Sequence, residues 1–80
     1  MIIKVLGSGC ANCVRLEANV KEALAASGIV DATVEKVTDY ADIAAYGIMS
    51  TPGLVVDDRV LVSGRVPDAA EVVQLIASAR

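Results

Sequence analysis

Residues 7–13, with the sequence GSGCANC, join a stretch typical of a β-strand to a stretch typical of an α-helix. The preceding residues 2–6 (IIKVL) are mostly apolar and β-branched, a composition that strands favour. In the following residues 11–27, apolar side chains recur at helical spacing and form one stripe: Cys13, Leu16, Val20 and Leu24. The sequence therefore predicts a C-x-x-C motif where a strand turns into the first turn of a helix.

The remainder of the chain predicts five further elements: a strand at 29–37, a short helix from 38 or 39 to 46, strands at 54–56 and 60–62, and a last helix at 68–80. Thr38 or Asp39 can cap the short helix. The tripeptide Asp57-Asp58-Arg59 indicates the turn of a hairpin. The last helix opens with the capping-box pattern of Asp68 and Glu71.

The resulting order, β-α-β-α-β-β-α, predicts an α/β fold. A strand–helix–strand opening favours a right-handed crossover and hence two parallel strands, whereas the closing hairpin is antiparallel. We expect a four-stranded mixed sheet with the spatial order 2-1-3-4 and helices on both faces. The 80 residues suit one domain, 1–80, and no linker or repeat divides them.

The composition narrows the range of functions. Ten acidic against seven basic residues give a net charge of −3, which disfavours nucleic acid as the main partner. No apolar stretch approaches the roughly 20 residues of a membrane span, and no signal peptide is visible, so we expect a cytoplasmic protein without a membrane partner. The absence of histidine excludes a Ser-His-Asp triad, a Cys-His pair and a Cys/His zinc site.

The two cysteines are therefore the strongest candidates for chemistry. Cys10 is expected at the start of the helix, where unpaired backbone N–H groups stabilise a thiolate, the nucleophilic form of cysteine. Gly7 and Gly9 leave the approach to Cys10 open. Cys13 follows one turn later, close enough to form a disulfide with Cys10. Two thiolates could also hold a soft ion such as Cu(I), and two structural cysteines are the plain alternative.

Together with motifs in the second half, this segment resembles the thioredoxin and glutaredoxin superfamily, and in particular its compact prokaryotic "redox-active disulfide" proteins. The further motifs are Tyr46-Gly47-Ile48 followed three residues later by Pro52, the segment 51–54 (TPGL) and the segment 63–66 (SGRV). The resemblance covers the whole chain. It implies a minimal thioredoxin-like fold, a cis bond before Pro52, and thiol–disulfide exchange without a bound cofactor. In that exchange Cys10 attacks a substrate disulfide and Cys13 resolves the mixed disulfide.

Four residues depart from the thioredoxin pattern. Gly9 replaces the tryptophan before the first cysteine, and Ala11-Asn12 replaces Gly-Pro between the cysteines. Lys4 stands where thioredoxins carry a buried acid. We interpret Lys4 as a strand lysine with a buried stem and a solvated ammonium group.

Three loops are expected to converge beside Cys10, because they meet strand ends at one edge of the sheet. Their candidate substrate-binding residues are Ala11 and Asn12, then Met49, Ser50, Thr51 and Pro52, and finally Gly64 and Arg65. The backbone of Thr51 could pair with an extended substrate, and Met49 could offer an adaptable apolar contact. Arg65 is either a charge for an acidic partner or for the thiolate, or merely a solvated residue. We expect a monomer that acts on a protein or small-molecule disulfide and receives electrons from a thiol or disulfide reductase.

Two alternatives remain at this point. Ferredoxin-like metal carriers also place C-x-x-C after their first strand, but their order is β-α-β-β-α-β and they end in a strand. A redox-silent module that only binds a partner is the second alternative.

Overall fold

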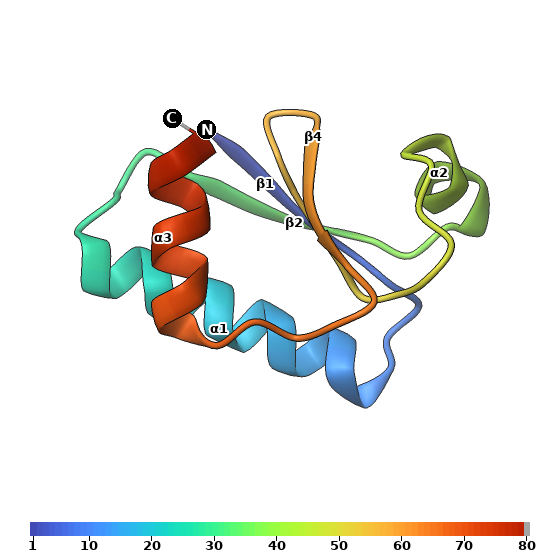
Figure 1. Cartoon of the computed structure of the whole chain (residues 1–80), viewed down its shortest axis with the longest axis horizontal. Coiled ribbons are helices and arrows are strands. Elements are labelled where there is room, and N and C mark those ends of the chain that lie inside the picture. The colour runs from blue at the N-terminus through green and yellow to red at the C-terminus, as the bar shows by residue number, and fades with distance from the viewer. Residues whose placement is uncertain (80) are drawn as a thin grey trace.

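The computed structural model describes residues 1–79 and has the predicted order of elements (Figure 1). They are β1 (Ile2–Leu6), α1 (Ala11–Ser27), β2 (Thr33–Val37), α2 (Tyr40–Ala45), β3 (Gly53–Val56), β4 (Arg59–Ser63) and α3 (Ala69–Ala79). None of the helices in this described part of the chain is long and apolar enough to cross a membrane.

The four strands form one mixed sheet in the order β2-β1-β3-β4, as the sequence predicts. β1 is parallel to β2, whereas β3 is antiparallel to both β1 and β4. In the register, Gly53 at the start of β3 lies opposite Leu6 at the end of β1 and Ser63 at the end of β4. The loops after β1, before β3 and after β4 therefore meet at one edge of the sheet, where the cysteines also lie.

Helices cover both faces of the sheet, which confirms the predicted architecture. α1 and α3 lie together on one face, and α2 lies on the other (Figure 1). Consecutive strand residues point to opposite faces, so Ile3 and Val5 join the α1/α3 core while Leu6 packs with Ile43 of α2. β3 is buried on both sides, which explains its unbroken apolar sequence.

The second strand begins four residues later than the predicted start at residue 29. Gly28 ends α1 in the left-handed conformation, with φ of 68°. The backbone N–H of Ile29 then donates a hydrogen bond of 3.1 Å to the carbonyl of Leu24, and the Ile29 side chain packs on the core. Ile29 therefore completes the helix end instead of opening a strand, as apolar residues after such a glycine cap often do.

The hairpin turn is one residue shorter than predicted. Asp57 and Asp58 have φ values of 48° and 66°, which match a two-residue type I′ turn, and Arg59 already belongs to β4. Asp57 also ties this turn to the first strand, because its Oδ1 accepts a hydrogen bond of 2.9 Å from the N–H of Ile2.

The helix caps follow the sequence with one exception. Asp39 caps α2 by accepting a hydrogen bond of 2.7 Å from the N–H of Ala41. Asp68 caps α3 in the same way, with a distance of 2.8 Å to the N–H of Glu71. The Glu71 carboxylate pairs with Arg65 and makes no reciprocal capping-box contact.

Candidate active site

Cys10 and Cys13 form a disulfide at the junction of β1 and α1, with their Cα atoms 5.1 Å apart. Cys10 is the N-cap of α1, with extended backbone at φ −69° and ψ 164°. Its sulfur accepts a hydrogen bond of 3.2 Å from the backbone N–H of Cys13. A cap position normally holds a side-chain oxygen that satisfies a free helix N–H group, and here a sulfur does so.

The two sulfur-bearing residues differ in their access to solvent. Cys10 is exposed, whereas Cys13 is only 5% exposed. Cys13 lies on the apolar stripe of α1 that also buries Leu16 and Val20. A substrate approaching from solvent therefore meets Cys10 first.

The segment before β3 lies close to the disulfide, and Gly7 stands between them. A Cβ atom added to Gly7 would overlap the Sγ of Cys13 and would lie 3.9 Å from the Cβ of Thr51. Thr51 is exposed, Pro52 is buried, and the peptide bond between them is cis. Gly7 thus stands between Cys13 and Thr51, two residues that are far apart in the sequence.

The loop after β4 adjoins this segment. Gly64 donates its N–H to the carbonyl of Pro52 at 2.9 Å, and a Cβ added to Gly64 would lie 3.0 Å from the Cβ of Ser50. Ala11 and Asn12, between the cysteines, are exposed, and Met49 is 100% exposed.

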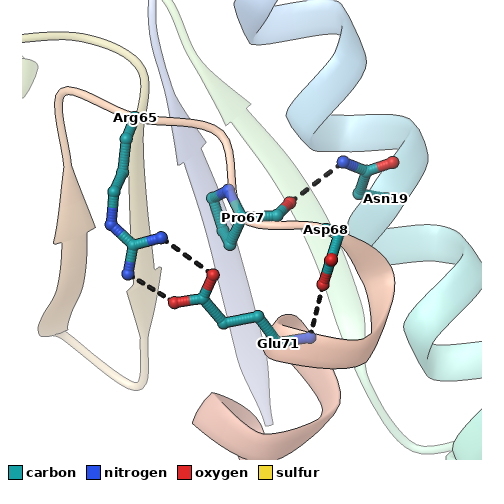
Figure 2. Close-up of polar contacts among 5 residues, drawn as sticks. All are labelled: Asn19, Arg65, Pro67, Asp68 and Glu71. Atoms are coloured by element: carbon teal, nitrogen blue, oxygen red, sulfur yellow. Dashed lines mark hydrogen bonds and ion pairs between the residues drawn. The ribbon is translucent and has the colours of Figure 1, made fainter.

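Arg65, by contrast, forms an ion pair with a residue close to it in the sequence. Its guanidinium donates two hydrogen bonds to the carboxylate of Glu71 on α3 (Figure 2). The hydrogen bond with Glu71 raises the pKa of Arg65, and the hydrogen bond from Arg65 lowers the pKa of Glu71. Asn19 of α1 holds the same loop by donating to the carbonyl of Pro67 at 2.9 Å (Figure 2). The positive charge of Arg65 is therefore balanced by Glu71, although the side chain stays 55% exposed.

Known proteins resemble this chain in sequence. The family model of the thioredoxin domain matches residues 1–77. The chain belongs to the thioredoxin family. It is 39% identical to a thioredoxin of Methanothermobacter thermautotrophicus, over 96% of this chain and 99% of that protein. It is 36% identical to a thioredoxin of Methanocaldococcus jannaschii, over 98% of this chain and 88% of that protein. The resemblance that the sequence motifs indicate is confirmed.

The observed fold also contradicts the interpretation of the chain as a ferredoxin-like metal carrier. The observed helix α2 between β2 and β3, and the terminal helix α3, do not occur in the β-α-β-β-α-β order. Within residues 1–79, no three His, Cys, Asp or Glu side chains gather in a way that could hold a metal ion.

The sequence patterns did not predict one polar cluster. The Lys4 ammonium donates a hydrogen bond of 2.8 Å to the Tyr46 hydroxyl and lies 3.9 Å from Oδ1 of Asp58. The hydrogen bond with Tyr46 raises the pKa of Lys4, against a smaller opposing effect of desolvation. The cluster borders a cavity of about 600 Å³ beside β2 and α2, which neither cysteine lines. Only the strand register brings Lys4 toward the hairpin turn, so no local motif could have revealed the cluster.

Proposed function

We propose that the chain is a thiol–disulfide oxidoreductase with Cys10 as the nucleophile and Cys13 as the resolving thiol. The observation that carries the proposal is the unequal exposure of two disulfide-bonded cysteines at a helix N-terminus. The membership of the thioredoxin family and the two thioredoxin relatives support it.

The reaction proceeds in two exchanges. The Cys10 thiolate attacks one sulfur of the substrate disulfide, which breaks that bond, forms a mixed disulfide and releases one substrate thiolate that takes a proton from solvent. Cys13 then loses its proton and attacks the Sγ of Cys10. The second substrate thiolate leaves, and the Cys10–Cys13 disulfide forms. A reductase or a dithiol must return two electrons and two protons to complete the cycle.

The helix N-terminus favours the first exchange. The backbone N–H of Cys13 already points at the Cys10 sulfur, and a negative sulfur at this position benefits from the partial positive charge of the helix end. Burial of Cys13 disfavours its charged form, so this thiol reacts only in the second exchange.

The substrate surface that we propose surrounds Cys10. It consists of Ala11, Asn12, Met49, Ser50, Thr51, Pro52 and Gly64. An extended segment of the substrate would pair with the backbone of Thr51, and Met49 would contact its apolar side chains. Support for this surface comes from the exposed positions of Met49 and Thr51 and from the place of Gly7 between Thr51 and Cys13. Arg65 is left out because Glu71 binds its guanidinium.

The wider setting that we propose follows from the same chemistry. The substrate is a protein or small-molecule disulfide, and the electron donor is a thiol or disulfide reductase. We propose a cytoplasmic, monomeric protein that forms one domain and needs no bound cofactor.

Trapping with insulin as the disulfide substrate tests the proposed roles. With dithiothreitol as electron donor, we expect the wild-type protein to accelerate insulin reduction and Cys10→Ser to be inactive. Cys13→Ser should accumulate as a mixed disulfide through Cys10, which mass spectrometry of the adduct identifies. A stable adduct formed by Cys10→Ser through Cys13, or turnover that survives both substitutions, would contradict the assignment.

A further inference from the structure

Gly7 is the residue whose missing side chain leaves room for the buried sulfur of the disulfide. A Cβ atom at this position would overlap the Sγ of Cys13 and would lie 3.1 Å from its Cβ. The backbone of Gly7 does not lie in the left-handed region, in contrast to that of Gly9, Gly28, Gly47 and Gly64. Its N–H donates to the carbonyl of Val37 at 2.9 Å, and an alanine would keep this hydrogen bond. The requirement for glycine at position 7 is therefore steric, and it concerns Cys13.

The overlap affects the two redox states unequally. In the disulfide, the Cys13 sulfur is fixed by its bond to Cys10 and cannot move away from an added methyl group. In the dithiol, the same sulfur can rotate about the Cα–Cβ bond into another staggered position. A cavity of about 100 Å³ beside Cys13, lined in part by Val5 and Val14, offers space for that movement. A methyl group at position 7 should thus disfavour the oxidised state more than the reduced state.

We infer that Gly7 is a positioning residue that helps to set the reduction potential of the Cys10–Cys13 pair, by giving the Cys13 sulfur the space that it occupies in the disulfide. The inference rests on the proposed function, in which this pair is the redox couple. In that couple the Cys10–Cys13 bond breaks, takes up two electrons and two protons, and gives two thiols. The reference dithiol loses the same two electrons and two protons and closes its own disulfide.

The test is a redox titration of wild type and Gly7→Ala in mixtures of reduced and oxidised dithiothreitol. The fraction of disulfide at each ratio is read from the mass gained after thiol alkylation. We expect the equilibrium of Gly7→Ala to shift at least tenfold toward the dithiol, which for a two-electron couple is a rise of about 30 mV in reduction potential. A shift of less than twofold, or a shift toward the disulfide, would overturn the inference.

Gly53→Ala is the matched control. Gly53 is also buried and also outside the left-handed region, but its added methyl group would meet the Cδ1 of Ile48 at 2.8 Å and the Cδ1 of Leu6 at 3.4 Å. This control should lower the stability of both redox states alike and leave the titration midpoint unchanged. An equal shift in Gly53→Ala would mean that general loosening of the fold moves the potential, and it would contradict the role of Gly7.

A second comparison covers the case in which Gly7→Ala folds poorly. Denaturant unfolding measures the stability of Gly7→Ala in its oxidised form, of Gly7→Ala in its reduced form, and of the double variant Gly7→Ala with Cys13→Ala. Each is compared with the protein that keeps Gly7 and is otherwise identical. We expect a large loss in the oxidised protein and a small loss in the other two, where the fixed sulfur is absent. Equal losses in all three, or unfolding of the reduced protein as well, would overturn the inference.

The dithiothreitol titration and the insulin assay together distinguish a failure of this inference from a failure of the proposed function. A wild-type protein that fails to reduce insulin while Gly7→Ala still shifts the titration would refute only the proposed function. Normal insulin reduction with identical titrations would refute only the inference.

Discussion

The sulfur of Cys10 accepts a hydrogen bond from the backbone N–H of Cys13 at 3.2 Å, so the two cysteines are joined through the helix cap as well as through the disulfide. The cap depends on the position of Cys10 before the first turn of α1, and not on the covalent bond. We therefore expect the same N–H group to remain available to a Cys10 thiolate once the disulfide is reduced.

Alkylation of the reduced protein should reveal this difference between the thiols. We expect iodoacetamide at neutral pH to label Cys10 several-fold faster than Cys13, because Cys10 is exposed and faces helix N–H groups. Peptide mapping by mass spectrometry gives the two rates. In the urea-unfolded protein the two rates should become equal. Faster labelling of Cys13 in the folded protein would reverse the proposed roles.

Met49→Ala should affect substrate binding without affecting the fold. Met49 is 100% exposed, so its truncation should change the free energy of unfolding by no more than about 0.5 kcal/mol. We expect a several-fold higher KM for a protein disulfide and an unchanged equilibrium with dithiothreitol. Val30→Ala is the control, because Val30 is 95% exposed in the loop between α1 and β2. If both variants keep the wild-type KM, Met49 is not part of the substrate surface.

The Arg65–Glu71 pair should contribute to stability in a pH-dependent way. The pKa of Glu71 lies below its ordinary value of 4.5, so its stabilising effect is present above pH 4.5 and is lost as the pH falls through the folded-state pKa. Denaturant unfolding should show Glu71→Gln to be slightly less stable than wild type at pH 7. The difference should shrink below pH 4.5 and also in high salt, because both side chains are partly exposed. A difference that grows on acidification would contradict the pairing.

Leu16→Ala should destabilise the fold strongly. Leu16 is fully buried between α1 and the sheet, and truncation of such a leucine costs about 2–5 kcal/mol of unfolding free energy. Val14→Ala, at a position that is 58% exposed, should cost less than about 1 kcal/mol. Urea unfolding measures both values. Similar losses for the two variants would show that the stripe of α1 is not the main support of the core.

Local patterns were sufficient for most of the fold. The stripe through Leu16 and Val20 predicts α1, and the paired aspartates predict the hairpin, because both signals depend on residues close in the sequence. The start of β2 was misplaced since Ile29 is β-branched and apolar, which suits either a strand or a helix end. Its hydrogen bond to Leu24 decides between them, and a helix end of this kind becomes visible only when the core that Ile29 packs against is present.

The sequence by itself determined the order of the elements, the C-x-x-C motif at a helix start, and the place of Cys13 on the apolar stripe of that helix. These features rest on hydrophobic periodicity and on caps, which act over one or two turns of chain. The tertiary structure alone decided that Gly7 separates Cys13 from Thr51 and that Lys4 meets Tyr46. Such contacts depend on strand register and on the packing of distant segments, where a shift of one residue would move every side chain to the other face of the sheet.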